Sequence, residues 1–430
     1  MWRRLSRLAA KSGSGTLSTT RIGWRNFGNG VPSEKMSIMF ELRDHAGSLP
    51  HALKFFSSND ISLTRIESRP VPTASNNFKF YVDFNGDPND PNVIKLVKEL
   101  KNKCVDVRVT DSKEVPWFPS RAEEADSLSK NIIGSDTGEL EADHPGFHDP
   151  VYKKRRAEIA KIALDYKYGD EIPRVDYTDQ EIECWQSIYQ KLIPLYEKHA
   201  CEEFNAIWPL VEKNCGYSAT SIPQLADISK YVKARTGFIL RPVAGLLSAR
   251  DFLYGLAFRI FFCTQYVRHH SKPLYTPEPD VAHEVMGHAP MFAVQEFADF
   301  SHQFGLLSIG ASDEQIDRIA RCYWYTVEFG VVQQQNARKA YGAGLLSSFG
   351  ELQYMASDEP EFIDWDPNVA AKEPYPITKY QPKYFVAKSF EDAQNKLIEF
   401  AERIERPFNV TYDKSGKLHV DSNIVQEPKL

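Results

Sequence analysis

Alternating and helical patterns of hydrophobic residues predict a small α+β domain near the N-terminus. Residues 36–43, MSIMFELR, alternate between apolar and polar side chains like a strand with one buried face. Ser48 is the expected N-cap of the first helix. The six segments in order are strand 36–43, helix 48–58, strand 61–70, strand 77–84, helix 91–103 and strand 104–110. This β-α-β-β-α-β order predicts a ferredoxin-like sandwich of one sheet and two helices over residues 35–112.

From residue 113 to residue 406 the hydrophobic positions recur mostly at helical spacing, which predicts a mainly α-helical domain. Residues 408–420, FNVTYDKSGKLHV, contain two short alternating runs around a Lys-Ser-Gly turn and predict a β-hairpin within a C-terminal arm, residues 407–430. The expected helical segments are residues 150–166, 179–214, 222–236, 250–268, 292–308 and 313–334.

Composition narrows the classes of function. The 430 residues are 42% hydrophobic, which is enough to bury a substantial core. The formal net charge of -6 offers no basic face for nucleic acid, and no apolar run approaches the roughly 18 to 20 residues that cross a membrane. The six cysteines form no C-x-x-C pair, so neither a disulfide framework nor a thiolate zinc site is indicated. We expect small molecules or proteins as partners.

The first 34 residues have the composition of an organelle transit peptide. No acidic residue precedes Glu34, whereas several arginines are spread among Ser, Thr, Ala and Leu. In MWRRLSRLAA the apolar and basic residues fall on different helical faces. We expect import into mitochondria, with a plastid or the cytosol as alternatives.

The segment HEVMGH, residues 283–288, misses the zinc-protease motif H-E-x-x-H by one position. On an undistorted α-helix, residues five apart differ by about 140° in direction, so His283 and His288 could not bind one ion. Gly287 precedes the second histidine and Pro290 follows it, so we expect the helix to bend or end there. Glu284 points elsewhere on the helix and is not an expected ligand.

A third ligand decides which metal two histidines bind. Glu328 in CYWYTVEFGVV is a lone carboxylate in a strongly apolar segment, where an unpaired charge would be costly. Two histidines and one carboxylate on one face of an ion are the facial triad of non-haem ferrous oxygenases. Taken singly, each histidine is more often a satisfied core residue, and a buried glutamate more often pairs with Arg or Tyr. A zinc hydrolase is the rival enzyme class, and Gly287 removes the second histidine that it needs.

Longer stretches around these residues resemble the pterin-dependent aromatic amino acid hydroxylases. They include RPVAGLLSARDFLYGLAFRIFFCTQYVRHHSKPLYTPEPDVAHEVMGHAP, YWYTVEFGVV and AYGAGLLSSFGELQY. Shorter matches follow in the same order, among them IPRVDYT, IPQL and SFEDAQNKLIEFA, so that the resemblance covers residues 35–425. It implies an iron- and pterin-dependent monooxygenase. The different-class alternative is an amino acid sensor that has lost catalysis.

The resemblance also implies roles for individual residues. It makes His283, His288 and Glu328 the ligands of Fe(2+). The tetrahydrobiopterin site would comprise Gly245, Leu247, Phe252, whose ring stacks on the pterin, and Glu284. The substrate site would comprise Arg268, which binds the carboxylate, its brace Asp280, and Thr276, Pro279, Trp324, Phe329 and Ser347. Phe262 stands where animal relatives have a histidine, so another reduced pterin or a folate is an alternative cofactor.

The substrate that the resemblance favours is L-phenylalanine, hydroxylated with O2 to L-tyrosine. Trp324 matches the phenylalanine and tyrosine hydroxylases, where tryptophan hydroxylases have Phe. Ile377 replaces an acidic residue of the tyrosine hydroxylases. A tryptophan 5-hydroxylase or mixed specificity is the alternative.

Residues 35–112 resemble the ACT regulatory domain of the same enzymes, which implies activation by phenylalanine. The matching segments are GSL and IESRP, and the implied effector residues are Gly47, Leu49, Ile66, Glu67 and Ser68. The resemblance makes the C-terminal hairpin a dimerisation arm. The helix that forms tetramers in the animal enzymes has no counterpart after Val420, so we expect a homodimer, with a weak tetramer as the alternative.

Overall fold

The computed structural model describes residues 35–43, 45–70, 77–87, 90–110, 116–132, 140, 142–377, 379–404, 410–413 and 416–420. These residues form two compact units, which divide between Phe118 and Pro119. The expected transit peptide, residues 1–34, lies outside the described residues, as do residues 405–409 and 421–430 of the C-terminal region. Within the described part of the chain, no helix combines the length and apolar character needed to span a membrane.

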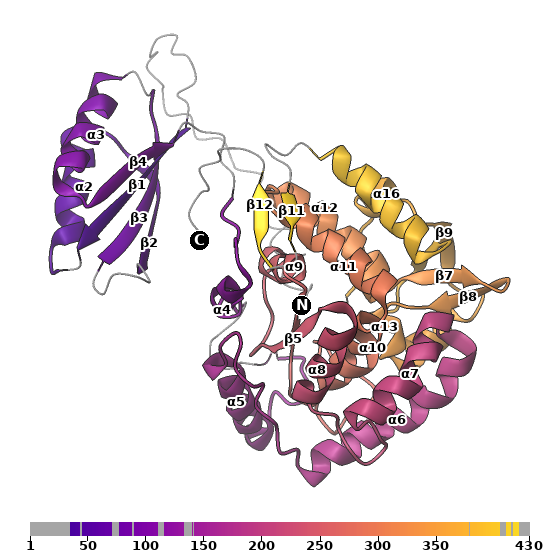
Figure 1. The fold of residues 1–430 in the computed structure, drawn as a ribbon. Helices are drawn as coiled ribbons and strands as arrows, with labels where there is room; N and C mark the ends of the chain where they lie inside the picture. Colours follow the sequence, from indigo (N-terminus) through magenta and orange to yellow (C-terminus); the bar gives the residue numbers. More distant parts are fainter. Residues whose placement is uncertain are drawn as a thin grey trace, which may run out of the picture. The chain divides into compact units, whose positions relative to one another are not determined.

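The N-terminal unit has the predicted β-α-β-β-α-β order. Its four strands form one antiparallel sheet in the order β2-β3-β1-β4, and the two helices cover one face of it (Figure 1). Phe40, Phe56 and Phe84 are fully buried between the sheet and the helices. The elements are β1 (Lys35–Arg43), α2 (Ser48–Ser58), β2 (Leu63–Pro70), β3 (Asn77–Asn85), α3 (Pro91–Lys103) and β4 (Asp106–Thr110).

Ser48 is not the N-cap of α2, contrary to the prediction. Gly47 occupies the cap position with φ 91°, and no side chain caps the helix. Glycine adopts this left-handed conformation readily because it has no Cβ. The turn at Gly47 makes Ser48 the first helical residue. The cap position therefore depends on the conformation of the preceding backbone.

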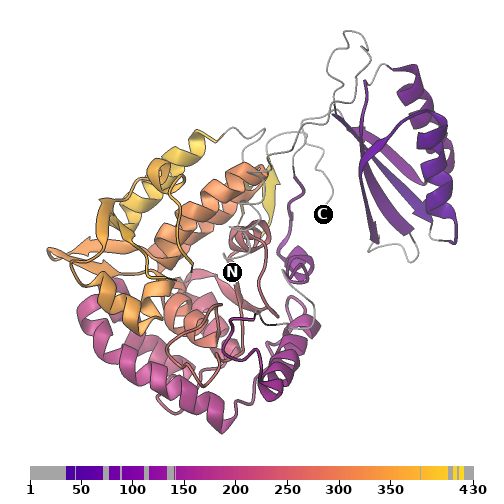
Figure 2. The same ribbon diagram turned by 180° about the vertical axis from the view of Figure 1, so that it is seen from behind.

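The C-terminal unit is mainly helical, as predicted, and its helices surround the short central elements (Figures 1 and 2). The longer helices are α5 (Pro150–Asp165), α6 (Asp179–His199), α7 (Glu202–Cys215), α8 (Leu225–Thr236), α9 (Ala249–Ala257), α11 (Gln295–Ser308), α12 (Asp313–Tyr323) and α16 (Phe390–Glu402). The shorter ones are η1 (Ala122–Glu124), α4 (Ala125–Leu128), η2 (His283–His288), α10 (Ala289–Phe292), η3 (Trp324–Glu328), α13 (Ala343–Leu346), α14 (Phe349–Met355) and α15 (Pro367–Ala370).

Small sheets complete this unit. Strands β5 and β6 pair in parallel, and four further strands form a sheet in the order β8-β7-β10-β9. The predicted C-terminal hairpin is present in the antiparallel pair β11 and β12, and Tyr412 packs its ring 4.8 Å from that of His302. The strands are β5 (Ile239–Pro242), β6 (Ile260–Cys263), β7 (Val331–Gln334), β8 (Ala337–Ala340), β9 (Glu361–Asp364), β10 (Lys383–Ala387), β11 (Val410–Tyr412) and β12 (Leu418–Val420).

Three predicted helical segments are divided in the structure. The segment 179–214 breaks after His199, where Cys201 caps α7 and its N–H donates to the carbonyl of Ala340. The segment 250–268 leaves the helix at Ala257 and continues as β6, all of whose residues are buried. The segment 313–334 ends as β7. A short run that is apolar on every side fits a buried strand as well as a buried helix, so periodicity alone could not separate them.

Candidate metal and substrate site

The HEVMGH segment forms a π-helix, which brings its two histidines to one side. The N–H of Ala289 donates to the carbonyl of Glu284, five residues earlier. In this wider turn, residues five apart lie on the same side of the helix. In an α-helix, residues four apart have that relation. The predicted helix end at Gly287 is therefore wrong, because the helix widens into a π-turn and continues into α10.

Contacts with other segments explain why the π-turn forms here. A Cβ on Gly287 would lie 2.6 Å from the carbonyl oxygen of Ala343, so only glycine allows α13 to approach this closely. Pro290 has no N–H to donate to the carbonyl of Val285, five residues before it. The hydroxyl of Tyr217 donates to that carbonyl instead, over 2.8 Å. The wide turn thus leaves this buried carbonyl satisfied.

Replacing Gly287 by alanine is expected to lower the free energy of unfolding by about 1–3 kcal/mol, because the new methyl group collides with backbone that cannot rotate away. Shifting η2 from α13 would also misplace His288, so the variant should retain less iron than the wild type. Urea unfolding and metal analysis measure the two effects. Wild-type stability with full iron content would contradict this explanation of the π-turn.

Glu328 completes a three-ligand cluster with the two histidines. It lies at the end of η3, a second π-helical segment, which follows α12. The two histidine Nε2 atoms are 3.0 Å apart, and the glutamate oxygens lie 3.1 Å from that of His288 and 3.5 Å from that of His283. Ligands about 2.1 Å from one ion and at right angles are about 3.0 Å apart. The spacing therefore fits three adjacent positions of an octahedron.

Hydrogen bonds and burial prepare His283 as a neutral ligand. The hydroxyl of Ser347 donates to the carbonyl of Ala343, so its oxygen is left to accept from Nδ1 of His283, 2.9 Å away. That tautomer directs the Nε2 lone pair towards the cluster. Burial also lowers the pKa of His283 to about 4, so the imidazole is uncharged at neutral pH. Ser347, which was predicted to contact substrate, thus also orients a ligand.

The donor set is suited to a ferrous ion. All three side chains are buried or nearly so, and Nδ1 of His288 has no hydrogen-bond partner among the described residues. Two imidazole nitrogens and a carboxylate are mainly acceptors, so they satisfy one another poorly by hydrogen bonds in an apolar setting. A cation bound between them satisfies all three. Two histidines and a carboxylate on one face leave three coordination positions for other molecules.

Glu284 lies beside the cluster but faces another partner, as predicted. Its carboxyl group accepts from the N–H and hydroxyl of Thr264, over 3.2 and 3.3 Å. Burial raises the pKa of Glu284 well above its ordinary value, which favours the protonated form of the carboxyl group. A neutral acid can donate as well as accept, which suits recognition of a polar heterocycle.

Arg268 and Asp280 form a buried, two-point ion pair. Nε and Nη2 of the guanidinium lie 2.9 and 2.7 Å from the two carboxylate oxygens, and the N–H of Arg268 also donates to Asp280. Burial would raise the pKa of Asp280, but the arginine outweighs it and lowers the pKa. Asp280 also accepts from the N–H of His283, so one carboxylate positions both the guanidinium and the start of η2.

A cavity of about 510 Å³ lies next to the cluster. Trp324 contributes to its aromatic wall; its ring stacks on that of Tyr375 at 4.5 Å and is tilted against that of Phe329 at 4.7 Å. Asp280 lies behind the wall and contributes through Arg268. The cavity brings together the other predicted substrate residues, Arg268, Thr276, Pro279, Trp324, Phe329 and Ser347, with His283 and Glu328.

The four predicted pterin residues line a separate, smaller cavity on the other side of the cluster. Its volume is about 20 Å³, which holds about one water molecule. A Cβ on Gly245 would lie 3.1 Å from the side chain of Ile132, which covers this region. The lining includes Gly245, Leu247, Phe252, Glu284 and Phe262 together with all three ligands of the cluster.

Two residues that support Trp324 were not predicted. The amide oxygen of Gln381 accepts from the indole N–H of Trp324 over 3.0 Å. Glu351 in turn accepts from the N–H of Gln381 and from the hydroxyl of Tyr384, and burial raises its pKa to about 7. A lone carboxylate among apolar residues, the same signal that indicates Glu328, could have identified Glu351. Gln381 carries no such signal.

The predicted effector residues lie in the N-terminal unit, at the start of α2 and in β2. Gly47 holds the left-handed turn, Leu49 is half-buried against the core, and Ile66 is 43% exposed on β2. Strand β2 is at one edge of the sheet, so its outer backbone groups have no strand beside them within the described sheet. The backbones of Glu67 and Ser68 pair with β3.

Comparisons with known proteins agree with the geometry. The model of the biopterin-dependent aromatic amino acid hydroxylases matches residues 116–425. Phenylalanine-4-hydroxylase of Caenorhabditis elegans is 50% identical over 389 residues, covering 88% of this chain and 85% of the relative. The human phenylalanine-4-hydroxylase is 48% identical over 382 residues, which cover 88% of this chain and 84% of the human protein.

Tyrosine 3-monooxygenase of Rattus norvegicus is equally similar, at 48% identity over 382 residues, 88% of this chain and 76% of its own. A solved structure of phenylalanine hydroxylase from Chromobacterium violaceum contains iron(III) and 7,8-dihydrobiopterin. It superimposes with a TM-score of 0.50 at 27% identity and covers 56% of this chain and 89% of its own. The chain therefore belongs to the family of biopterin-dependent aromatic amino acid hydroxylases.

Proposed function

We propose that the protein is an Fe(2+)- and tetrahydrobiopterin-dependent monooxygenase that hydroxylates L-phenylalanine to L-tyrosine with O2. The observation that carries the proposal is the facial cluster of His283, His288 and Glu328 beside a cavity lined by the guanidinium of Arg268 and by aromatic side chains. The iron and the reduced pterin supply the redox chemistry by which O2 is activated.

The chain's own residues bind and orient the reactants. Asp280 occupies the edge of the Arg268 guanidinium that Nε and Nη2 form. The edge that Nη1 and Nη2 form is therefore the one that can bind a substrate carboxylate. Trp324 and Phe329 offer apolar surface to a phenyl ring and exclude water from it. Glu284, whose protonated form is favoured by burial, is placed to hydrogen-bond the pterin, and Phe252 to stack on it.

The preference for phenylalanine rests on two residues of the cavity. Overall similarity does not decide it, because a tyrosine 3-monooxygenase is as close as the human phenylalanine-4-hydroxylase. Ile377 lines the cavity and provides no partner for a phenol hydroxyl. Trp324 is fixed by Gln381 and by Tyr375, so the wall does not yield to a larger indole. Tryptophan hydroxylation or mixed specificity is the second candidate.

With iron and tetrahydrobiopterin, phenylalanine is expected to be turned over with a kcat/KM at least about tenfold above those for tryptophan and tyrosine, since apolar pockets discriminate by about 1–3 kcal/mol. Steady-state assays with the three amino acids, read by product chromatography, measure this. Replacing tetrahydrobiopterin by a reduced folate identifies the reductant, because Phe262 borders the pterin cavity. Faster turnover of tryptophan than of phenylalanine would overturn the assignment.

We also propose that the N-terminal unit is an ACT domain that binds phenylalanine as an effector at the interface of two copies. The exposed Ile66 and the edge position of β2 support it, because an edge strand with an exposed apolar side chain is suited to meet a second copy. The hairpin β11–β12 supports a homodimer. The composition of residues 1–34 supports import into mitochondria.

The full chain is expected to show a sigmoidal dependence of rate on phenylalanine, and a variant that begins near Val115 is expected to lose it, because that variant lacks the effector site. It should keep iron and catalysis, since the metal cluster and both cavities lie beyond that residue. Initial rates across a range of phenylalanine concentrations test this. Hyperbolic kinetics in the full chain would refute the regulation without affecting the catalytic assignment.

A further inference from the structure

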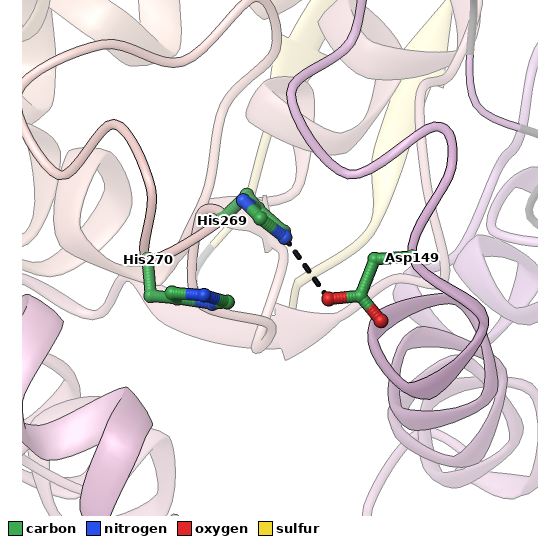
Figure 3. Close-up of side chains that lie close together, drawn as sticks. All are labelled: Asp149, His269 and His270. Atoms are coloured by element: carbon green, nitrogen blue, oxygen red, sulfur yellow. Dashed lines mark hydrogen bonds and ion pairs between the residues drawn. The ribbon is translucent and has the colours of Figure 1, made fainter.

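A second group of metal-binding side chains lies at the surface of the C-terminal unit. Asp149, at the start of α5, and the adjacent His269 and His270 present ligand atoms that all lie within 4.8 Å of one another (Figure 3). The carboxylate Oδ2 is 3.2 Å from Nε2 of His269. The ring of His270 packs 4.3 Å from that of His269 and is exposed. The ligands thus come from two segments that are far apart in the chain.

Two of the three side chains are already fixed in position. Asp149 is the N-cap of α5, and its Oδ1 accepts from the N–H groups of Val151 and Tyr152, which leaves Oδ2 directed at His269. The Tyr152 ring meets the His269 ring edge-on at 4.9 Å. A Cβ on Gly146 would lie 2.4 Å from Tyr152 and 3.0 Å from His269, so the glycine allows this packing.

His269 also has a partner that can hold its proton. Its Nδ1 lies 2.8 Å from the hydroxyl oxygen of Ser271 and accepts from the backbone N–H of Ser271 over 3.3 Å, so without a metal the ring proton belongs on Nε2, which donates to Asp149. A histidine that binds a metal through Nε2 carries its proton on Nδ1 and donates it to a neighbour, and Ser271 can accept it. Binding would therefore replace the hydrogen bond from Nε2 to Asp149 by two bonds to one ion.

We propose that Asp149, His269 and His270 bind a divalent transition metal ion of the Zn2+ type, which ties the turn after Arg268 to the start of α5. Two imidazoles and a carboxylate, with water in the fourth position, are a common ligand set for zinc. Tetrahedral ligands about 2.0–2.1 Å from the ion lie about 3.3 Å apart, close to the distance between Asp149 and His269. The exposed His270 supplies the third bond by rotating its side chain.

The test measures zinc on the iron-loaded full-length protein, so that the catalytic cluster is already occupied. After incubation with zinc and removal of the free ion, metal analysis should find about one zinc per chain with the iron content unchanged. The H270G and D149N variants should bind zinc at least about tenfold more weakly. D149N keeps the helix cap, because asparagine also accepts from the N–H groups. H51N, which removes an exposed histidine of the N-terminal unit, is the matched control and should bind like the wild type.

Two results would overturn the proposal. One is that H270G and D149N bind as much zinc as the control H51N. The other is zinc uptake that an equal loss of iron accompanies, which would place the zinc at His283, His288 and Glu328. Thermal unfolding without zinc should show the same midpoint for H270G and the wild type, because an exposed ring is removed. A zinc-dependent rise in the midpoint of the wild type that H270G lacks would support the site independently.

Discussion

Replacing Glu328 by alanine is expected to reduce bound iron to below about a tenth of an ion per chain and kcat/KM by at least about 10³-fold, or about 4 kcal/mol. The carboxylate supplies the negative charge of the cluster and lies 3.1 and 3.5 Å from the two histidine nitrogens. Without it, two neutral imidazoles in an apolar setting would face a dication with no charge to offset it. Metal analysis after gel filtration and product chromatography measure both effects.

The matched control for this variant is E284Q. Glu284 is as buried as Glu328 and lies in η2 beside a ligand, but its carboxyl group bonds to Thr264. Glutamine mimics the protonated acid that burial favours there, so E284Q should retain full iron. Weaker pterin binding with normal iron would separate its role from that of Glu328. An E328A variant that keeps wild-type iron, or an E284Q variant that loses it, would contradict the ligand assignment.

The residues of the metal cluster could be predicted from the sequence, but the local backbone structure that brings them together could not. A histidine pair and a lone glutamate in an apolar segment indicated the metal cluster, and the structure places these three side chains together. The means by which they meet was not predicted. The π-turn depends on the contact of Gly287 with Ala343 and on the hydroxyl of Tyr217, and both partners are distant in the chain.

The same limit applies to the fold. The N-terminal β-α-β-β-α-β order could be predicted because its strands are short alternating runs, as in β1, where Met36, Ile38, Phe40 and Leu42 are buried on one face. In the C-terminal unit, residues 260–263 are buried on all sides, so their pattern did not distinguish strand from helix. The left-handed backbone of Arg259, with φ 54°, ends the preceding helix, and no property of an arginine side chain indicates such a conformation.

Replacing Arg268 by lysine is expected to lower kcat/KM for phenylalanine by about 10²-fold to 10³-fold, mainly through KM, while iron content stays normal. Two of the guanidinium nitrogens are engaged with Asp280, and Nη1 donates to the carbonyl of Pro273 over 3.4 Å, so the second hydrogens of Nη1 and Nη2 remain for a second carboxylate. A lysine ammonium can pair with Asp280 but cannot present two parallel N–H groups to the substrate as well. Alanine is a poorer test, because it would leave Asp280, which is 0% exposed, as an unpaired charge at a cost of about 3–5 kcal/mol.

K379Q is the matched control for R268K, since Lys379 lines the same cavity but is exposed and is not part of the ion pair. Loss of that charge is expected to change kcat/KM by less than about threefold, because exposed charges are screened by solvent. A larger effect of K379Q than of R268K would indicate that Lys379, and not Arg268, binds the carboxylate of the substrate. Both residues line the same cavity, so the pair of variants identifies which of the two cations binds the substrate carboxylate.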